Sequence, residues 1–425
     1  MAQLSDDCFA HGGALMTVPE ALEMLRSRTE ALVATEACRL PDALGRVLAE
    51  DIIAPASVPP HPNSAVDGYA VSYGDLSEDS ETRLKIGGRL PAGDRPAEHY
   101  EAGTALRIFT GAILPPGFDT VFMQEDCSLE QDDTIVVLPK GLKKGSNARA
   151  AGEDILKGET LLKKGHRLRG VDLGFLSSAG YGQFRVYTPL KIALFSTGNE
   201  LHDPVTRTDD ASLPEGAIFD SNRYTLLGFL KSRGITVTDL GILPDDGAAM
   251  KTALADAARE HDLVMTSGGV SVGEEDHVKD AIGALGSIHA WRLAIKPGRP
   301  IAFGQIGSTP FIGMPGNPVA VVVTFLGVVW PFLCHLSHQT YIEPMGQQLK
   351  AGFKHKKKKD RREWVRASCH LNSDGTVELV KYPRDGAGVL SSVCLSDGLI
   401  ELPENALGIE SGDLVTFYSF RELGL

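Results

Sequence analysis

The spacing of apolar residues changes several times along the chain, and each change predicts a different kind of domain. Thr17-Val18-Pro19-Glu20 has the form of a capping box, and apolar residues follow it at helical intervals. The same interval recurs from Leu44 to Ile52. We therefore expect the first fifty residues to be largely helical.

The next stretch is rich in β-forming residues, with short runs separated by Gly and Pro. The runs are 84–86, 121–123 and 134–138. Helical spacing then returns at Val171, Phe175 and Leu176. A β domain over residues 56–144 is thus predicted as an insertion into a helical, elongated domain made of residues 1–55 and 145–187.

Strand-like and helix-like patterns alternate between residues 188 and 335. The predicted strands are 192–195, 235–243, 263–266, 300–303 and 311–312, and the predicted helices are 222–233, 248–261, 275–285 and 319–330. Such alternation is typical of an open α/β sheet built from parallel crossovers. Strands and turns return over 336–425, with Asn372-Ser373-Asp374-Gly375 as a hairpin loop, and predict a small β barrel or sandwich.

Composition narrows the classes of function. The 425 residues carry a net charge of −13 and a pI near 5.4, which argues against a general nucleic-acid binder. The six cysteines lie far apart without a CxxC pair, so we expect neither a zinc ribbon nor a disulfide framework. The first fifteen residues contain no apolar run, so no signal peptide is predicted and a cytoplasmic location is expected.

One apolar segment, 319–336, has about the length of the shortest membrane span. Thr324 and Pro331 interrupt it, and Asn317-Pro318 opens it as a helix cap followed by a first-turn proline. We therefore predict a buried helix packed on the sheet, and no membrane partner.

Unusual residues follow the predicted strands of the α/β domain. In open α/β sheets, ligands bind beyond the carboxyl ends of the strands. The loops at those ends are 196–200, 244–246, 266–276 and 315–318. We expect these loops to form one pocket.

The glycine-rich loop 266–276 predicts a phosphate site. Gly268 and Gly269 allow a close backbone approach, Ser267 and Ser271 add hydroxyl donors, and the following helix offers free N–H groups. The same helix start carries Glu274, Glu275 and Asp276. Two like charges 4 Å apart repel by about 4 kcal/mol at an effective dielectric near 20, and a bridging Mg²⁺ would remove that conflict. The alternative is that these acids only complement the helix dipole.

Other charged residues have both a functional and an ordinary interpretation. Arg292 and Lys296 precede a strand and could clamp phosphates or an oxyanion, or could be solvated surface. Residues 354–366 hold eight Lys or Arg side chains, which favours a solvated loop that helps to attract an anionic ligand over a nucleic-acid patch. In the β domain and the segment directly after it, Asp67, Thr110, Arg149 and Asp154 lie in loops that spacing alone assigns to turns.

Taken together, the motifs resemble those of the molybdopterin molybdenumtransferase family, the MoeA-type enzymes, which are similar to the E domain of gephyrin. The resemblance runs from about Thr17 to Leu425. It rests on six motifs in family order, which are Asn63-Ser64-Ala65-Val66-Asp67-Gly68-Tyr69-Ala70-Val71, Thr110-Gly111-Ala112, Gly152-Glu153-Asp154, Ser196-Thr197-Gly198-Asn199-Glu200-Leu201, Thr266-Ser267-Gly268-Gly269-Val270-Ser271-Val272-Gly273 and Pro315-Gly316-Asn317-Pro318.

The resemblance implies a multidomain α/β plus β protein. Its parts would be a dimerisation domain (1–55 and 145–187), an inserted β domain, a MogA-like molybdopterin-binding domain (188–335) and a C-terminal β barrel (336–425). The implied enzyme forms a homodimer with its site between protomers. It takes adenylylated molybdopterin and molybdate, hydrolyses the adenylyl link and inserts molybdenum, and AMP and molybdenum cofactor leave. A contact with the molybdopterin adenylyltransferase is also expected.

Family positions, together with the pocket expected at the carboxyl ends of the strands (the rim of the sheet), give the expected site. The expected catalytic residues are Asp67, Glu200, Asp246, Asp276, Lys296 and Arg292. The expected substrate-binding residues are Thr110, Arg149, Asp154, Ser267, Gly268, Gly269, Ser271, Pro315, Gly316 and Pro318. We hypothesise that Glu200, Asp246 and Asp276 hold Mg²⁺ on the pyrophosphate and that Lys296 with Arg292 stabilises developing charge. Whether Asp245 or Asp246 is the site acid stays open.

The sequence departs from the family pattern in three places: Arg292 replaces a common lysine, Ala150-Ala151 replaces residues that are often basic, and His61-Pro62 stands where Phe-Asp is frequent. Two alternatives remain. A molybdopterin adenylyltransferase is similar to the α/β domain alone, and the β-domain motif around Asp67 argues against it. A non-catalytic scaffold like gephyrin would tolerate loss of the rim acids, which are intact here.

Overall fold

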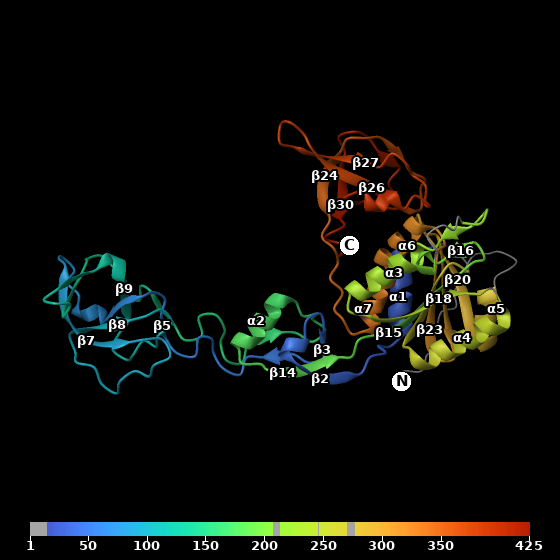
Figure 1. The fold of residues 1–425 in the computed structure, drawn as a ribbon. Helices are drawn as coiled ribbons and strands as arrows, with labels where there is room; N and C mark the ends of the chain where they lie inside the picture. The colour runs from blue at the N-terminus through green and yellow to red at the C-terminus, as the bar shows by residue number, and fades with distance from the viewer. Residues whose placement is uncertain (1–14, 207–212, 245, 270–276) are drawn as a thin grey trace.

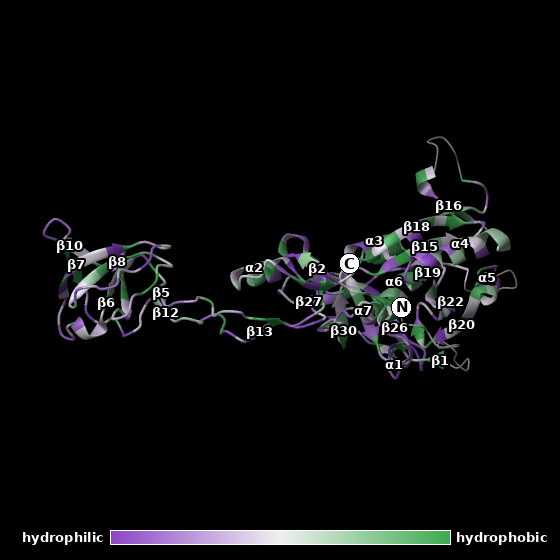
Figure 2. Ribbon diagram, turned by 90° about the horizontal axis from the view of Figure 1, so that it is seen from below, coloured by the Kyte–Doolittle hydropathy of each residue, from purple (hydrophilic) through white to green (hydrophobic). Residues whose placement is uncertain are grey.

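The chain is elongated, with a small β module at one end and an α/β domain at the other (Figure 1). The computed structural model describes residues 15–206, 213–244, 246–269 and 277–425. A slender middle segment joins the two ends, and Figure 2 shows the same separation from below. A C-terminal β domain lies beside the α/β domain (Figure 1).

A seven-stranded sheet forms the centre of the α/β domain, in the order β1-β20-β22-β23-β19-β15-β18. Its strands are β1 (Leu15–Met16), β15 (Lys191–Thr197), β18 (Thr236–Leu243), β19 (Leu263–Ser267), β20 (Gly286–Leu293), β22 (Pro300–Ile306) and β23 (Thr309–Met314). Strands β18, β15, β19 and β23 pair in parallel, whereas β22 is antiparallel to both of its neighbours. The prediction of parallel crossovers alone is wrong here, because the chain turns back through residues 294–299 without a crossover helix.

Helices cover both faces of this sheet. They are α1 (Val18–Arg28), α3 (Asn222–Ser232), α4 (Gly247–Glu260), α5 (His277–Leu285), α6 (Pro318–Thr324) and α7 (Trp330–Leu336). One hydrophobic core joins the sheet to α1, α3, α6 and α7, and a second joins its other face to α4 and α5. Because β1 pairs with β20 and α1 lies in the first core, the structure places Leu15 to Arg28 with the α/β domain rather than with the middle segment.

The apolar segment predicted as a buried helix is buried. Among the described residues, Pro318–Leu336 is the one helix long and apolar enough to cross a membrane, and 83% of its apolar window is covered by the protein. A π turn, Phe325–Val329, joins α6 to α7 just before Pro331. Proline has no N–H for the helical ladder, and a local π turn is a common way to accommodate such a break.

The helical prediction for the first fifty residues is wrong beyond Arg28. Short strands follow instead, namely β2 (Thr35–Arg39), β3 (Val47–Leu48) and β4 (Ile52–Ile53). Both β2 and β3 pair with β14 (Gln183–Tyr187), and Gly45 has a φ of 75°, which no α-helix contains. The apolar spacing there reflects pairing with a distant strand. The helix predicted around Val171 is present as α2 (Gly170–Ser178).

The β module holds a six-stranded sheet in the order β10-β11-β7-β8-β6-β9. Its strands are β6 (Gly68–Val71), β7 (Thr82–Leu90), β8 (Thr104–Ile108), β9 (Thr120–Met123), β10 (Ser128–Glu130) and β11 (Ile135–Leu138). Two short ladders bring the entering and leaving segments together. They are β5 (Asn63–Ser64) with β12 (Ala148–Arg149), and β4 with β13 (Thr160–Leu162).

The C-terminal domain is a small closed β barrel, as the sequence predicts. Its main strands are β24 (Gln347–Ala351), β26 (Arg362–Leu371), β27 (Val377–Lys381), β28 (Gly398–Leu402) and β30 (Leu414–Ser419), with β25 (His355–Lys356), β29 (Gly408–Ile409) and α8 (Ser391–Cys394) around them. The predicted hairpin loop joins β26 to β27, where Leu371 pairs with Val377. Strand β21 (Ile295–Lys296) of the α/β domain pairs in parallel with β26 and ties the two domains together.

Candidate functional site

Three parallel strands end side by side, and the loops after them line one cavity. Ser196 pairs with Ser267 and Ser267 pairs with Met314, so β15, β19 and β23 reach the same rim. The cavity has a volume of about 840 Å³. From these loops it is lined by Thr197, Gly198, Asn199, Glu200, Gly268, Gly269, Pro315, Gly316 and Asn317. The structure thus brings together three of the four loops expected to share a pocket.

The turn between β20 and β22 adds the cationic side of the cavity. Strand β20 ends and β22 begins at the same rim, because these two strands are antiparallel neighbours. The turn contributes Lys296, Pro297, Gly298, Arg299 and Pro300. The Lys296 side chain is 51% exposed, so its ammonium group is open to a ligand.

The C-terminal barrel forms the opposite wall, which the sequence did not predict. It contributes Glu363, Trp364, Val365, Arg366, Asp385 and Ala387. Lys296 Nζ donates a hydrogen bond of 2.8 Å to Glu363 Oε1, and the N–H of Val319 donates to the Ala387 carbonyl at 3.0 Å. These contacts close the cavity between the two domains.

The basic stretch 354–366 is not a simple solvated loop. Lys357 is 8% exposed, and its ammonium group donates to the carbonyls of Lys358, Glu404 and Ala406. Arg366 is 6% exposed and donates from Nε to Ser392 Oγ at 3.0 Å. The interpretation as solvated surface is therefore wrong for these two side chains, because they hold barrel loops in place.

Glu200 owes its position to a glycine two residues before it. Glu200 is exposed at the cavity, and its carboxylate folds back over Gly198, whose φ is +144°. A Cβ at residue 198 would lie 2.6 Å from Glu200 Oε2, too close for any real contact. Gly198 therefore supplies both the backbone conformation and the room that the carboxylate needs.

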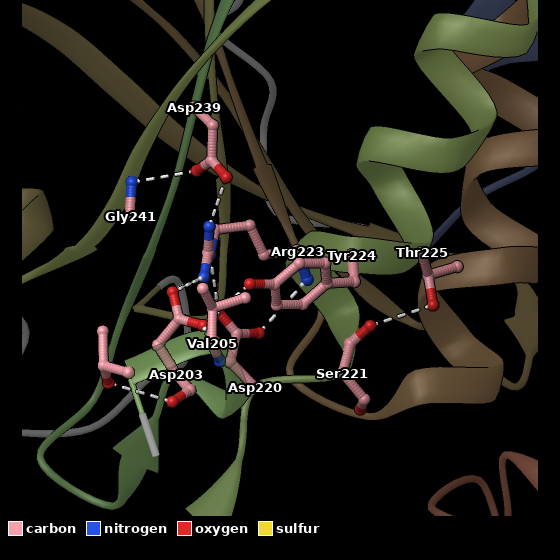
Figure 3. Close-up of polar contacts among 10 residues, drawn as sticks. Asp203, Val205, Asp220, Ser221, Arg223, Tyr224, Thr225, Asp239 and Gly241 are labelled. Carbon is pink, nitrogen blue, oxygen red and sulfur yellow. Dashed lines mark hydrogen bonds and ion pairs between the residues drawn. The ribbon is translucent and has the colours of Figure 1, made fainter. Parts of the chain in front are cut away.

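A buried ion cluster anchors the chain directly after Glu200. Figure 3 shows Arg223 surrounded by Asp203, Asp220 and Asp239. Arg223 is 1% exposed and donates from Nε to Asp220 Oδ2 at 2.9 Å. Burial alone would lower the pKa of Arg223, but hydrogen bonds to the three carboxylates outweigh burial and raise it. Since β16 (Leu201–His202) leads from Glu200 to Asp203, this cluster fixes the loop that carries Glu200.

The glycine-rich loop packs tightly where the structure describes it. Gly268 and Gly269 have φ values of 86° and 65°, which favour glycine. A Cβ on Gly269 would lie 2.5 Å from Thr197 Cγ2 and 2.6 Å from Val278 Cγ2. The loop is therefore pressed between the end of β15 and the start of α5, with its backbone along the cavity.

Several predicted site residues do not line this cavity. Asp246 caps α4, with Oδ1 accepting from the N–H groups of Ala248 at 3.0 Å and Ala249 at 2.8 Å. It follows β18, which lies on the far side of β15 from β19, so the strand order explains its separation. Ser267 is buried inside β19, at 2% exposure.

Two further predicted residues, Arg292 within β20 and Pro318 at the start of α6, also lie outside the cavity lining. Asp245, Ser271 and Asp276 lie outside the described residues.

The described acids fit a magnesium ion only in part. Within the described ranges, no group of three or more His, Cys, Asp or Glu side chains forms a metal cage. Magnesium is often held by one or two carboxylates together with substrate phosphates and water. Glu200, an exposed carboxylate that lines the cavity, fits that donor set, whereas Asp246 already uses one oxygen as a helix cap.

A second group of predicted residues lies in the β module and its connection. Asp67 Oδ1 accepts from the N–H and the hydroxyl of Thr110, at 2.8 Å each. These bonds, the backbone bond first, lower the pKa of Asp67. Arg149 lies on β12, with its Nε 4.0 Å from Glu153 Oε1, and the exposed Asp154 follows it. Within one chain this group is at the opposite end from the cavity (Figure 1).

The cavity carries both signs of charge. Its cationic side chains are Lys296, Arg299 and Arg366, and its carboxylates are Glu200, Glu363 and Asp385. Burial raises the pKa of Glu363, but hydrogen bonds from His355 and Lys296 outweigh burial and lower it, so this carboxyl is ionised. The arrangement suits a ligand with several anionic groups that also recruits a cation.

Each part of the chain matches a described protein family. Residues 16–180 match the MoeA N-terminal region (domains I and II), 193–335 match a probable molybdopterin-binding domain, and 348–420 match the MoeA C-terminal region (domain IV).

Relatives match over most of the chain. The chain is 36% identical over 412 residues to the molybdopterin molybdenumtransferase of Haemophilus influenzae, which covers 96% of this chain and 100% of that protein. It is 32% identical to gephyrin of Dictyostelium discoideum over 342 residues, 70% of this chain and 46% of gephyrin. The crystal structure of the molybdopterin biosynthesis MoeA protein from Pyrococcus horikoshii superposes with a TM-score of 0.78 at 28% identity, over 96% of this chain and 100% of that one.

Proposed function

The chain belongs to the molybdopterin molybdenumtransferase family, and from that membership we propose that it inserts molybdenum from molybdate into adenylylated molybdopterin. The adenylyl link is hydrolysed, and AMP and molybdenum cofactor leave. The observation that carries this proposal is the 840 Å³ cavity, which is lined by two glycine-containing loops, Lys296 and Glu200.

The chain's own residues supply positioning and charge neutralisation, which dominate catalysis of phosphoryl transfer. The glycine-rich loop after β19, where Gly268 and Gly269 line the cavity, binds phosphate oxygens of the substrate through its backbone; the Gly268 N–H is not one of the donors, because it already donates to the Met314 carbonyl. A water or molybdate oxygen attacks the adenylyl phosphorus, a new P–O bond forms, and the P–O bond to the molybdopterin phosphate breaks. The Lys296 ammonium stabilises the charge that develops on the leaving oxygen.

Arg299 lines the cavity and takes the second cationic role that was expected of Arg292. Arg299 therefore assists Lys296 in binding the anionic groups of molybdate and pyrophosphate.

Magnesium is the proposed cofactor. Glu200 would hold it together with substrate phosphates, and Asp276 is the further ligand expected from the sequence. Bound there, Mg²⁺ would neutralise the pyrophosphate.

A homodimer is the proposed assembly. Asp67, Thr110, Arg149 and Asp154 lie far from the cavity of their own chain (Figure 1). They would complete the cavity of a partner chain, as a C2 dimer of an elongated protomer allows. A transient contact with the molybdopterin adenylyltransferase, and a cytoplasmic location, are part of the same proposal.

The alternatives fit the chain less well. An adenylyltransferase of the α/β domain alone would lack the β module and the barrel, which this chain shares with full-length molybdenumtransferases. A purely structural scaffold would not need Glu200 and Lys296 at one cavity.

The test is AMP release from adenylylated molybdopterin by the purified protein with Mg²⁺, in the presence and absence of molybdate. We expect release that depends on molybdate. Release that never responds to molybdate, or consumption of ATP with free molybdopterin, would refute the proposal.

A further inference from the structure

A chain of hydrogen bonds runs from Lys296 into the C-terminal barrel. Lys296 Nζ is 2.8 Å from Glu363 Oε1, and the same oxygen is 2.9 Å from His355 Nε2. Lys381 Nζ is 3.1 Å from His355 Nδ1 and 2.7 Å from Asp385 Oδ2. The side chains of Glu363 and His355 are each 6% exposed. This series of hydrogen bonds begins and ends at the cavity, because Lys296 and Asp385 both line it.

The roles of the donors follow from what each group can do. An ammonium group can only donate, so Lys381 donates to Nδ1 of His355 and that nitrogen accepts. The ring proton of His355 is then on Nε2, which donates to Glu363. Glu363 accepts from both His355 and Lys296 through one oxygen. The position of each donated proton is therefore defined, and Oε1 of Glu363 accepts two hydrogen bonds, one from each neighbour.

The backbone fixes the same ion pair. Lys296 on β21 lies opposite Glu363 on β26 in a parallel pairing, so the register that joins the two domains also sets the distance between these side chains. An ammonium group has three N–H bonds. With one donated to Glu363, two are left for a ligand, since Lys296 lines the cavity and its side chain is half exposed.

We propose that Glu363 is a positioning residue for Lys296, and that His355 and Lys381 hold Glu363 in turn. The C-terminal barrel thereby orients the cation that stabilises the transition state. This inference rests on the proposed function, since it takes Lys296 as the charge-stabilising group. Glu363 also repels an anionic substrate, so its removal weakens catalysis without weakening binding.

The test is a double-mutant cycle on kcat and KM for AMP release. In the wild-type background, Glu363→Ala is expected to lower kcat about 10- to 100-fold with KM unchanged or lower. In the Lys296→Ala background, the same change is expected to alter kcat less than about twofold, because the group on which Glu363 acts is gone. Glu363→Gln keeps the shape and the acceptor oxygen but not the charge, and is expected to lose roughly fivefold in kcat.

Glu401→Gln is the matched control. Glu401 lies on the neighbouring strand β28, is 15% exposed and pairs with Arg362 at 2.8 Å outside this cavity. It should keep the wild-type kcat.

Effects of Glu363→Ala and Lys296→Ala that multiply would overturn the inference, as would a Glu363→Gln variant with the kcat of the wild type. The Gln variant decides the matter if Glu363→Ala does not fold. Normal turnover in Lys296→Ala alone would instead remove the role that the proposed function gives to Lys296.

Discussion

Single residues set the charge of the cavity, and two of them were predictable from the sequence. Glu200 follows a predicted strand, and Lys296 precedes one, next to Pro297-Gly298 at the strand entrance. Both line the cavity. Glu363 was not predictable, because it lies 67 residues after Lys296 and reaches it only through the pairing of β21 with β26. Asp246 was expected at the cavity from its family position and from its place after a strand. It instead caps α4, the helix that follows the edge strand β18.

Replacing Lys296 by Ala is predicted to lower kcat for AMP release by about 100-fold, the usual effect of removing one group that stabilises transition-state charge. Lys350→Ala, on the exposed face of β24, is the control and should leave the rate unchanged. Steady-state AMP release measures both. A Lys296→Ala rate within a factor of about two of the wild type would rule out the proposed role.

A second residue-scale prediction concerns Gly198. Gly198→Ala is expected to reduce AMP release strongly, because its Cβ would push away the Glu200 carboxylate. Gly216→Ala is the control, since Gly216 also has a positive φ, 83°, but no atom within 4 Å of an added Cβ. Both variants should lose about 1 kcal/mol from backbone strain. Equal activity in the two variants would show that the position of Glu200 does not depend on Gly198.

Elements were predictable where local pattern and tertiary pairing agree. The helices α1, α2 and α4 and the hairpin after β26 follow from spacing, caps and turn residues. Residues 44–52 have helical spacing but form strands, because β14 supplies a partner that local pattern does not reveal. Strand β20 escaped prediction, and with it the antiparallel turn that carries Lys296 to the rim.

The element after Glu200 gives a test of stability against pH. Burial raises the pKa of Asp203, but hydrogen bonds from Tyr224, the Val205 N–H and Arg223 outweigh burial and lower it. A carboxyl group whose pKa is lowered by folding stabilises the protein above its unfolded pKa, near 3.9, and loses that contribution as pH falls. Arg223→Met would leave three carboxylates without their cation. We predict a loss of about 3–5 kcal/mol at pH 7. The loss at pH 4.5 should be smaller, because in the variant Arg223 no longer offsets the burial that raises the pKa of Asp203, and this carboxylate can take up a proton.

Urea unfolding followed by tryptophan fluorescence measures this difference, because Trp291 is buried in the same domain. The control is Arg259→Met on α4, where Arg259 is 75% exposed and pairs with Asp256, and it should cost less than about 1 kcal/mol at either pH. An equal loss at both pH values for Arg223→Met would contradict the assigned role of the cluster.

At the scale of the whole molecule, the order of domains was readable from the sequence but their arrangement was not. The β module was recognised as an insertion from its strand-rich pattern between two other stretches. Nothing in that pattern shows that the module stands at the far end of an elongated chain (Figure 1). The closure of the cavity by the barrel likewise depends on contacts between distant segments, namely the pairing of β21 with β26 and the hydrogen bond from Val319 to Ala387.

In the proposed dimer, each site combines the rim of one chain with the β module of the other. The most direct measurement mixes two inactive variants, Lys296→Ala and Asp67→Ala, after joint unfolding and refolding. In a random mixture half of the dimers pair the two variants, and each such dimer has one intact site of two, so about a quarter of the wild-type AMP release should return. A mixture with no more activity than the separate variants would contradict a site shared between protomers.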